Sequence, residues 1–347
     1  DGRSSKYYIV PGKGSTGDDL LAKNPNRLAK KIKGKTPSNV FDAYLQSGSP
    51  TDPAGAVGPN HYIAVFNTGF IIYDKDGDAI TSQLSPTNVF GNISYCCDLT
   101  VSYDVAADRF VMTILDFGSG WTVAVSQGPD PWIDGWHVYA WGTGSDYQKL
   151  SIWSDAYYVT DNTGGQEKVF ALERDAMIAG DPTAQYVGFP LNGLSTFGFY
   201  SPQAFNVTNG DMPATGNAPI VYMVDDAWNS GPGGDRLTLW LADVDWNNPS
   251  GSSISSSPTN LSVTPFLSVF DNGSFSNLTQ PNSGPALDAL QATIMNQAQF
   301  RKFPTHNSAV FNFVVDLDGS AGELAGVRWY ELRQDGDGQP WSIYQEG

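Results

Sequence analysis

The sequence predicts an all-β protein, a β-propeller with five or more blades of three to four antiparallel strands. The first observation behind this prediction is a recurring pair of apolar segments, each ending in a short polar turn. The second is the spacing of the copies, which begin near residues 61, 108, 155, 219 and 309, so that three of them recur about every 47 residues. Repeats of this length are typical of propeller blades, because a single blade cannot bury both of its faces. A large irregular β-sandwich is the alternative, but it gives no reason for the spacing.

Each copy contributes two apolar strands, and further strands are expected beside several of the pairs. The pairs lie at 61–67 with 69–77, 108–118 with 121–132, 155–162 with 167–175, 219–228 with 235–246, and 308–316 with 326–336. Flanking strands are expected at 99–104, 135–141, 184–190 and 341–347. Three or four strands per copy suit a propeller blade.

Two regions interrupt the repeats and set the domain boundaries. Residues 1–50 are predicted to form an N-terminal arm and residues 51–347 the propeller domain, with a long surface insertion at 247–286 that is rich in Ser, Asn and Pro. The arm carries seven lysines and two arginines, whereas the whole chain has a formal net charge of −17. We therefore expect the arm to run across the acidic body or onto a neighbouring molecule, and to be dispensable for folding.

The strongly negative charge excludes two classes of partner. A surface with a net charge of −17 repels nucleic acid phosphates and anionic membranes, so neither is predicted to bind. No apolar run is long enough for a membrane span, and the first residues lack the apolar core of a signal peptide. The sequence therefore predicts a processed, secreted protein of the extracellular space or the cell surface.

The two cysteines, Cys96 and Cys97, are adjacent and cannot join distant segments. Two small unpaired side chains are one interpretation, and a vicinal disulfide is the other. In an oxidising compartment, where disulfides persist, we expect the two residues to be joined to each other.

Five strings between residues 45 and 347 carry a family resemblance: DPAGAVGPNHY at 52–62, YDVAADRF at 103–110, WSDAYYVTDN at 153–162, VDDAW at 224–228 and GVRWYELR at 326–333. They resemble the N-terminal propeller-like region of large, secreted, multidomain bacterial surface proteins. The resemblance implies an extracellular propeller domain and no established reaction, so it supplies no catalytic residues. Such relatives continue past the WSIYQ strand, which predicts an unpaired edge at Trp341–Tyr344 that a further strand would cover.

Four residues are candidates for proton transfer, although the sequence contains no complete catalytic signature. His61 and His306 each open a repeated strand, and the innermost strands of a propeller begin near its axis. Tyr62 and Arg301 lie close to them in sequence. An arginine that neutralises a uronate carboxylate, with a histidine or tyrosine that moves the proton, would serve a polysaccharide lyase. Turn residues that satisfy local hydrogen bonds are the alternative.

Carboxylates near strand ends give a second set of candidates. Two facing carboxylates would make a glycoside hydrolase, and Asp98 is among the residues that could contribute one. Aspartates also cap turns, which is the structural alternative. The residues predicted to contact a ligand are Asp52, Asn60, His61, Asp155, Asp225 and Asp226.

Calcium is the one cofactor that the sequence suggests. Asp74, Asp76 and Asp78 alternate in the string DKDGD, and carboxylate oxygens at such positions suit Ca²⁺. The EF-hand loop pattern with its terminal glutamate is missing, and an ordinary Asp-Gly hairpin turn explains the same string.

The function predicted first is a secreted binding or adhesion module that recognises a glycan or a cell-surface protein. The second hypothesis is a carbohydrate-active enzyme, either a polysaccharide lyase or a glycoside hydrolase, with its site on the propeller axis. The third is a structural subunit that self-assembles through the N-terminal arm or the C-terminal edge strand. A basic or carboxylate-paired pocket on the axis would favour the enzyme, whereas a flat, filled axis would favour binding or assembly.

Overall fold

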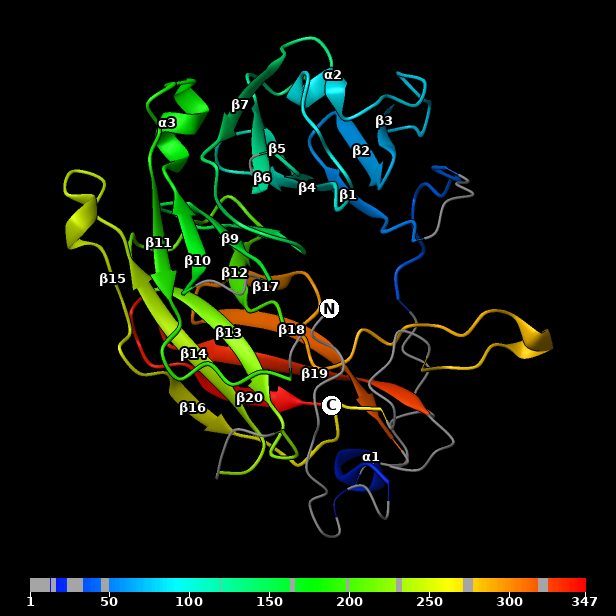
Figure 1. The fold of residues 1–347 in the computed structure, drawn as a ribbon, viewed down its shortest axis with the longest axis vertical. Coiled ribbons are helices and arrows are strands. Elements are labelled where there is room, and N and C mark those ends of the chain that lie inside the picture. The colour runs from blue at the N-terminus through cyan, green and yellow to red at the C-terminus, as the bar shows by residue number, and fades with distance from the viewer. Residues whose placement is uncertain are drawn as a thin grey trace.

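The computed structural model is an all-β propeller whose strands fall into five blade-like groups (Figure 1). It describes residues 13, 17–23, 34–44, 50–118, 120–162, 166–197, 200–228, 233–270, 277–317 and 324–347. The fold class predicted from the repeat spacing is therefore confirmed, with three to four antiparallel strands in each group.

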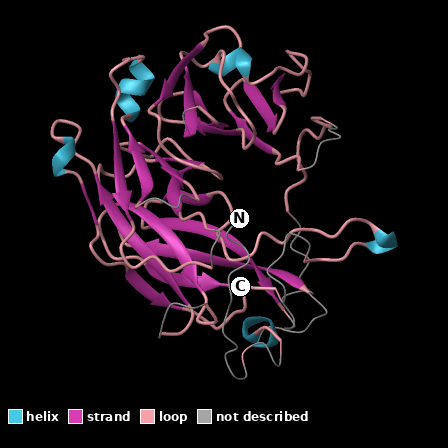
Figure 2. Ribbon diagram, viewed as in Figure 1, coloured by secondary structure: helices cyan, strands magenta, loops and turns pink. Residues whose placement is uncertain are grey.

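Helices are short and lie in the connections at the periphery of the strands (Figure 2). They are α1 (Asp19–Lys23), α2 (Thr87–Phe90), α3 (Arg174–Ala179) and 3₁₀ turns at Pro249–Gly251 and Pro281–Ser283. Within the described ranges, every helix is too short or too polar to cross a bilayer.

The first three blades are separate antiparallel sheets in which each strand pairs with the next along the chain. Blade 1 consists of β1 (Ala54–Val57), β2 (His61–Phe66) and β3 (Gly69–Asp74). Blade 2 consists of β4 (Thr100–Asp104), β5 (Arg109–Asp116), β6 (Gly120–Ser126) and β7 (Trp136–Ala140). Blade 3 consists of β8 (Lys149–Ile152), β9 (Tyr157–Thr160), β10 (Glu167–Leu172) and β11 (Tyr186–Pro190).

The last two blades share one sheet. Blade 4 consists of β12 (Gln203–Val207), β13 (Ala218–Val224) and β14 (Arg236–Asp243), with β15 (Ser253–Ile254) and β16 (Thr259–Ser262) on its outer edge. Blade 5 consists of β17 (Ala298–Lys302), β18 (Asn307–Asp316), β19 (Ala325–Gln334) and β20 (Ser342–Glu346). The innermost strands β12 and β17 pair in parallel, which joins the two blades. Part of the predicted 247–286 insertion thus supplies outer strands of blade 4.

The paired segments found in the sequence are the second and third strands of each blade rather than the first. The copy near residue 61 is β2 with β3, and the copy near residue 108 is β5 with β6. The innermost strands β1 and β8 have four residues each, which is too short for a repeating apolar pattern to stand out.

The middle strands of blade 2 are apolar on both faces because this blade packs between blades 1 and 3. In β5, Phe110 and Met112 face a core shared with Ile63 of blade 1. Val111, which points to the opposite face, belongs to a core shared with Tyr157 of blade 3. Since successive side chains of a strand alternate between its faces, a strand buried on both sides is apolar at nearly every position.

The described residues of the N-terminal arm (13, 17–23 and 34–44) contact blades 4, 5 and 1. The Lys13 ammonium lies among three carboxylates of blade 4. The Asp18 carboxylate pairs with Arg328 on β19, and both side chains are buried. The Phe41 and Tyr44 rings pack against β2 and β3. The described residues of the arm therefore cross the acidic body as expected, and they do so through buried ion pairs.

The prediction that residues 341–344 need a partner strand is wrong. β20 pairs with β19 in the same blade and forms the outer strand of that sheet. Trp341, which precedes β20, is buried against Phe205 and Phe300. Blade 5 therefore completes its own set of strands, and its outer edge is where a propeller blade ordinarily meets solvent.

Candidate active site on the propeller axis

A pocket of about 940 Å³ opens where the innermost strands of four blades begin. Its lining comes from residues 50–55 at β1, 98–101 at β4, 146–149 at β8 and 288–299 at β17. Because these strands run in the same sense, the turns that precede them meet at one end of the axis. The pocket is wide enough for several linked sugar-sized groups, since ligand cavities of roughly 300–1,000 Å³ hold drug-sized molecules.

Three of the blades place a left-handed residue at the same position of this rim. Asp52, Asp98 and Tyr147 each stand two residues before an innermost strand, with φ values of 44°, 59° and 61°. A residue with a β-carbon in this conformation costs roughly 1–3 kcal/mol, and such residues cluster at functional sites. The rim is therefore built in a conformation that the local sequence does not favour.

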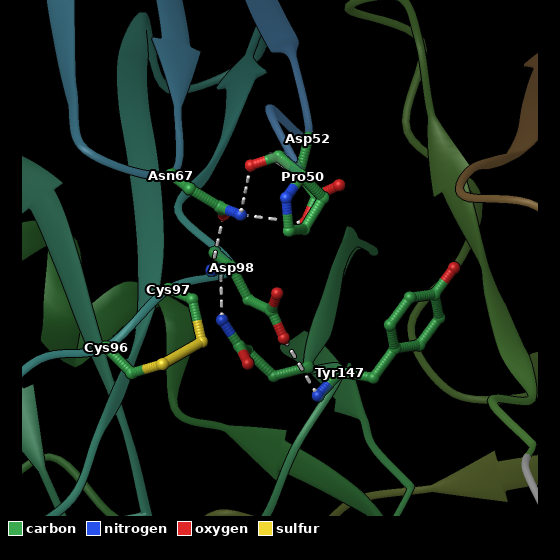
Figure 3. Close-up of a disulfide and its surroundings, with 8 residues drawn as sticks. Pro50, Asp52, Asn67, Cys96, Cys97, Asp98 and Tyr147 are labelled. Carbon is green, nitrogen blue, oxygen red and sulfur yellow. Dashed lines mark hydrogen bonds between the residues drawn. A yellow bond between two sulfur atoms is a disulfide. The ribbon is translucent and has the colours of Figure 1, made fainter. Parts of the chain in front are cut away.

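A hydrogen-bond network holds Asp98 and Asp52 together (Figure 3). The Asp98 backbone N–H donates to Asn67 Oδ1 at 2.9 Å, and Asn67 Nδ2 donates to Asp52 Oδ2 at 2.9 Å. Gln148 Nε2 donates to the Asp98 carbonyl at 2.6 Å, and the Tyr147 N–H donates to Asp98 Oδ2 at 3.1 Å. The Asn67 side chain thus binds the Asp52 carboxylate through its amide nitrogen and the Asp98 backbone N–H through its amide oxygen.

The position of Asp98 in the pocket raises the pKa of its carboxyl above the usual value, chiefly through burial. Burial raises the pKa of Asp98, Lys149 opposes this shift, and the negative charges of Asp146 and Asp52 add to it. Burial also lowers the pKa of Lys149, which the same three carboxylates partly offset. The Lys149 ammonium lies 3.9 Å from the centroid of the Tyr147 ring. A buried carboxyl with a raised pKa that shares a pocket with other carboxyl groups is the kind of group that general acid catalysis uses.

Gln297 forms the floor of the pocket and ties four blades at the axis. It stands directly before β17, and its Nε2 donates to Ser102 Oγ of blade 2 at 2.8 Å and to the Leu150 carbonyl of blade 3 at 3.1 Å. Its Oε1 accepts a 3.1 Å hydrogen bond from Asn206 Nδ2 of blade 4. One side chain of blade 5 thereby bonds to the innermost strands of three other blades.

We expect Gln297→Ala to lower the free energy of unfolding by about 1–3 kcal/mol, because it leaves partly buried polar groups on three blades without their partner. Urea unfolding followed by tryptophan fluorescence measures the change. The matched control is Gln299→Ala, two residues away and exposed, which is expected to stay within about 0.5 kcal/mol of the wild type. Equal effects of the two variants would contradict the axial role of Gln297.

The prediction that His61 and Tyr62 lie near the axial site is wrong. β1 begins at the pocket and ends at Val57, and the turn that follows, with the exposed Asn60, reverses the chain at the far end of the blade. His61 Nε2 there lies 3.7 Å from Asp130 Oδ2. The Tyr62 ring packs against Phe41 of the arm.

Arg301 and His306 are displaced from the pocket for the same reason. β17 begins at the pocket, and the turn between β17 and β18 places both residues at the far end of blade 5. The His306 ring stacks on Phe303 at 5.0 Å, and the Arg301 guanidinium lies 5.8 Å from the same ring. These four proton-transfer candidates therefore do not assemble into one lyase site.

Among the predicted ligand-contacting residues, the pocket includes Asp52. Asp155 lies in the turn between β8 and β9, where its carboxylate accepts a hydrogen bond from the Gly216 N–H at 2.9 Å and burial raises its pKa. Its role there is structural.

Asp225 and Asp226 form an acidic cluster with Asp235, whose carboxylate oxygens lie within 4.8 Å of one another. Lys13 Nζ occupies the centre of this cluster at 2.5, 2.5 and 2.7 Å from the three carboxylates. The two residues predicted to contact a ligand therefore hold a lysine of the same chain.

The aspartates suggested as calcium ligands form a turn. Asp74 Oδ1 accepts hydrogen bonds of 2.9 Å from the backbone N–H groups of Asp76, Gly77 and Asp78. In the part of the chain that the structure describes, the acidic side chains that converge closely enough for a cation are Asp225, Asp226 and Asp235, and not these three.

The vicinal disulfide is confirmed: Cys96 and Cys97 are bonded to each other. The pocket residues that the sequence did not reveal include Asp146, Tyr147, Lys149 and Gln297. The signal for Asp146 and Tyr147 was their place before a short innermost strand, as for Asp52 and Asp98. Gln297 also stands directly before an innermost strand, but its role depends on partners from three other blades.

No protein-family model matches the chain, and no curated protein matches it. The solved structures to which it is similar include an α-L-arabinanase from Cellvibrio cellulosa in complex with arabinohexaose, at 12% identity over 84% of this chain and 94% of that chain, with a TM-score of 0.32. An α-L-arabinofuranosidase from Clostridium thermocellum matches at 13% identity over 85% and 93%, with a TM-score of 0.33. A GH43_1 enzyme from Xanthomonas citri in complex with xylose matches at 11% identity over 81% and 87%, with a TM-score of 0.35.

These overlaps are too loose to carry a residue or an activity to this chain. The axis itself corrects the order of the functional hypotheses, in which a binding or adhesion module stood first. It is an open pocket with several carboxylates rather than a flat, filled surface, and such a pocket favours the enzyme.

Proposed function

We propose that the protein is a glycoside hydrolase whose axial pocket binds a neutral glycan. The observation that carries the proposal is that Asp52 and Asp98 line one pocket, with the Asn67 side chain hydrogen-bonded to both residues and with burial raising the pKa of Asp98. Hydrolysis of a glycosidic bond needs one carboxyl that donates a proton and one carboxylate that acts on the sugar or on water.

In this proposal Asp98 is the general acid, which protonates the leaving oxygen of the scissile bond. Asp52 is the second carboxylate, because the Asn67 side chain orients it from the neighbouring rim position. Whether Asp52 acts as the nucleophile or as the base for a water molecule depends on the distance between the Asp52 and Asp98 carboxyl groups in the complex with the sugar. Lys149 tunes the acid by opposing the rise in the pKa of Asp98.

A hydrolase fits this pocket better than a lyase does. A polysaccharide lyase must neutralise the carboxylate of a uronate, and Lys149 is the sole cation among the described residues that line the pocket. Three carboxylates, those of Asp52, Asp98 and Asp146, already act on it. A negatively charged sugar would add repulsion in a site of this kind.

The test is incubation with a panel of neutral and uronate-containing polysaccharides, reading both new reducing ends and unsaturated products. A hydrolase yields new reducing ends without unsaturation, and a lyase yields the unsaturated sugar. Retention on a glycan column without any product would contradict the enzyme proposal. Products from uronate polymers alone would contradict the choice of hydrolase.

We expect hydrolysis to decline as the pH rises through the pKa of Asp98, because the acid must hold its proton and burial raises that pKa. Lys149→Met removes the positive charge that opposes the shift, so the alkaline limb of kcat/KM should move to higher pH. The exposed Lys35 supplies the control variant Lys35→Met, which should leave the limb in place. A limb that moves to lower pH in Lys149→Met would show that a different group titrates.

We also propose that the protein works outside the cell. The Cys96–Cys97 disulfide supports this setting, because such bonds persist in oxidising compartments.

A further inference from the structure

The vicinal disulfide stands directly before the candidate acid in the chain. Cys97 is followed by Asp98, and Figure 3 shows the disulfide beside the network of Asp98, Asn67 and Asp52. Cys96 is exposed and Cys97 is half-buried, so a small thiol reductant can reach the bond.

We propose that the Cys96–Cys97 disulfide is a positioning device for the Asp98 carboxyl, and that its reduction loosens the rim of the pocket without unfolding the propeller. The catalytic consequence rests on the function proposed above. The structural consequence does not, because it concerns the backbone of residues 96–98 and its partner Tyr147.

The first argument concerns what such a disulfide can stabilise. A bond between residues far apart stabilises a fold by closing a long loop in the unfolded chain, and the effect grows with loop length. The two cysteines are adjacent in the sequence, so their bond closes no such loop. Its effect therefore falls on the torsions of the peptide between them and on the residue that follows.

The second argument is that this short ring is anchored on its other side. The Cys96 N–H donates to the Leu115 carbonyl at 3.1 Å, and the Leu115 N–H donates to the Cys97 carbonyl at 3.2 Å. Both cysteines are thus fixed to the end of β5. The closed ring transmits that fixed position to the next residue, Asp98.

The third argument is the conformation of Asp98. Its φ of 59° lies in the left-handed region, which an aspartate leaves readily when the chain is free to turn. In this orientation of the backbone its carboxylate accepts the hydrogen bond from the Tyr147 N–H. Opening the ring gives back the torsional freedom of the preceding peptide, so Asp98 can leave the orientation that aims its carboxyl at the pocket.

The reduction itself is an ordinary thiol–disulfide exchange. A dithiol reductant supplies two electrons and two protons, the S–S bond breaks into two thiols, and the reductant closes to its own disulfide. Reoxidation by an oxidised dithiol reverses each change.

The experiment is hydrogen exchange of backbone amides in the oxidised and dithiol-reduced protein. We expect the amides of Asp98 and Tyr147 to exchange about tenfold faster after reduction, as for a local opening, while the Ile220 amide in β13 keeps its rate. The double variant Cys96→Ser with Cys97→Ser should show the faster rates from the start and no response to the reductant.

Two results would overturn the proposal. Unchanged exchange at both Asp98 and Tyr147 would show that the disulfide does not hold the rim. Faster exchange at every amide, Ile220 included, would show that it holds the whole fold instead.

Glycan hydrolysis is the second measurement, and it separates this proposal from the function. If the protein hydrolyses a glycan, reduction should lower kcat and leave KM nearly unchanged, because the acid is misplaced while the rest of the pocket remains. An equal kcat in the two redox states would overturn the positioning role. If no glycan is hydrolysed in either state, the proposed function fails, and the exchange rates still decide the effect of the disulfide on Asp98.

Discussion

Replacing Asp98 by asparagine is expected to lower kcat on a neutral glycan by about 10²–10⁴-fold, the usual contribution of a general acid. Asparagine keeps an oxygen that can accept the hydrogen bond from the Tyr147 N–H, so the rim should keep its shape. It cannot give a proton to the leaving oxygen. Initial rates of product release over a range of substrate concentrations, with urea unfolding in parallel, measure both effects.

The matched control is Asp211→Asn, an exposed aspartate outside the pocket lining, which should keep the wild-type kcat. An aryl glycoside whose leaving group needs little protonation should restore much of the rate of Asp98→Asn, since the missing proton then matters less. A variant that keeps full activity on the polysaccharide would remove Asp98 from the reaction. A loss that follows unfolding rather than kcat would assign it a structural role.

Replacing Lys13 by methionine is expected to lower the free energy of unfolding by about 3–5 kcal/mol at neutral pH, as for a buried ion pair that loses one partner. Asp225 and Asp235 are almost completely buried, and Lys13 Nζ lies 2.5 Å and 2.7 Å from their carboxylates. Without the ammonium, their negative charges face one another and Asp226 with no cation between them. Chemical denaturation at constant ionic strength measures the loss.

The loss should shrink as the pH falls. Burial, together with the charge of Asp225, raises the pKa of Asp235 to about 6. Below that pH the folded protein holds a proton on Asp235. The repulsion among the three carboxyl groups is then weaker in the variant, and the attraction between Lys13 and Asp235 is weaker in the wild type. The exposed Lys23 at the end of α1 provides the control variant Lys23→Met. A loss that is the same at pH 5 and pH 8 would contradict the ionic origin of the effect.

The sequence was sufficient to predict the propeller but not the inner strands that line its axis. Strands buried on both faces, such as β13, give continuous apolar segments that stand out in the sequence. The four residues of β1 read AGAV, and those of β8 read KLSI, and neither shows a periodic pattern. The five repeats therefore predicted the propeller with five or more blades, but each repeated strand was placed one position too far inward in its blade.

Because the repeated strands were taken as the innermost strands of the blades, residues at their starts were placed at the wrong end of the axis. Because an antiparallel blade reverses direction at each turn, residues that open the second strand lie at the opposite end from those that open the first. His61 and His306 were therefore assigned to the wrong end, whereas Asp52 and Asp98 stand before first strands. Lys149 could not be identified, because its importance depends on carboxylates from turns about 50 and 100 positions earlier, which only the fold brings together.

The contacts that complete the ring also determine when the ring can be completed. Gln297 and Ser102 are 195 positions apart, Lys13 and Asp225 are 212 apart, and Asp18 and Arg328 are 310 apart. Contacts this distant in sequence must overcome a large loss of chain entropy, and proteins rich in them fold slowly. During synthesis on the ribosome, the arm and the first three blades emerge long before the residues of blade 5 that they contact. The arm, which is made before blade 5, thus has to wait for its buried partner. The apolar faces of the blades made before blade 5 stay exposed to chaperones and to other chains during that time.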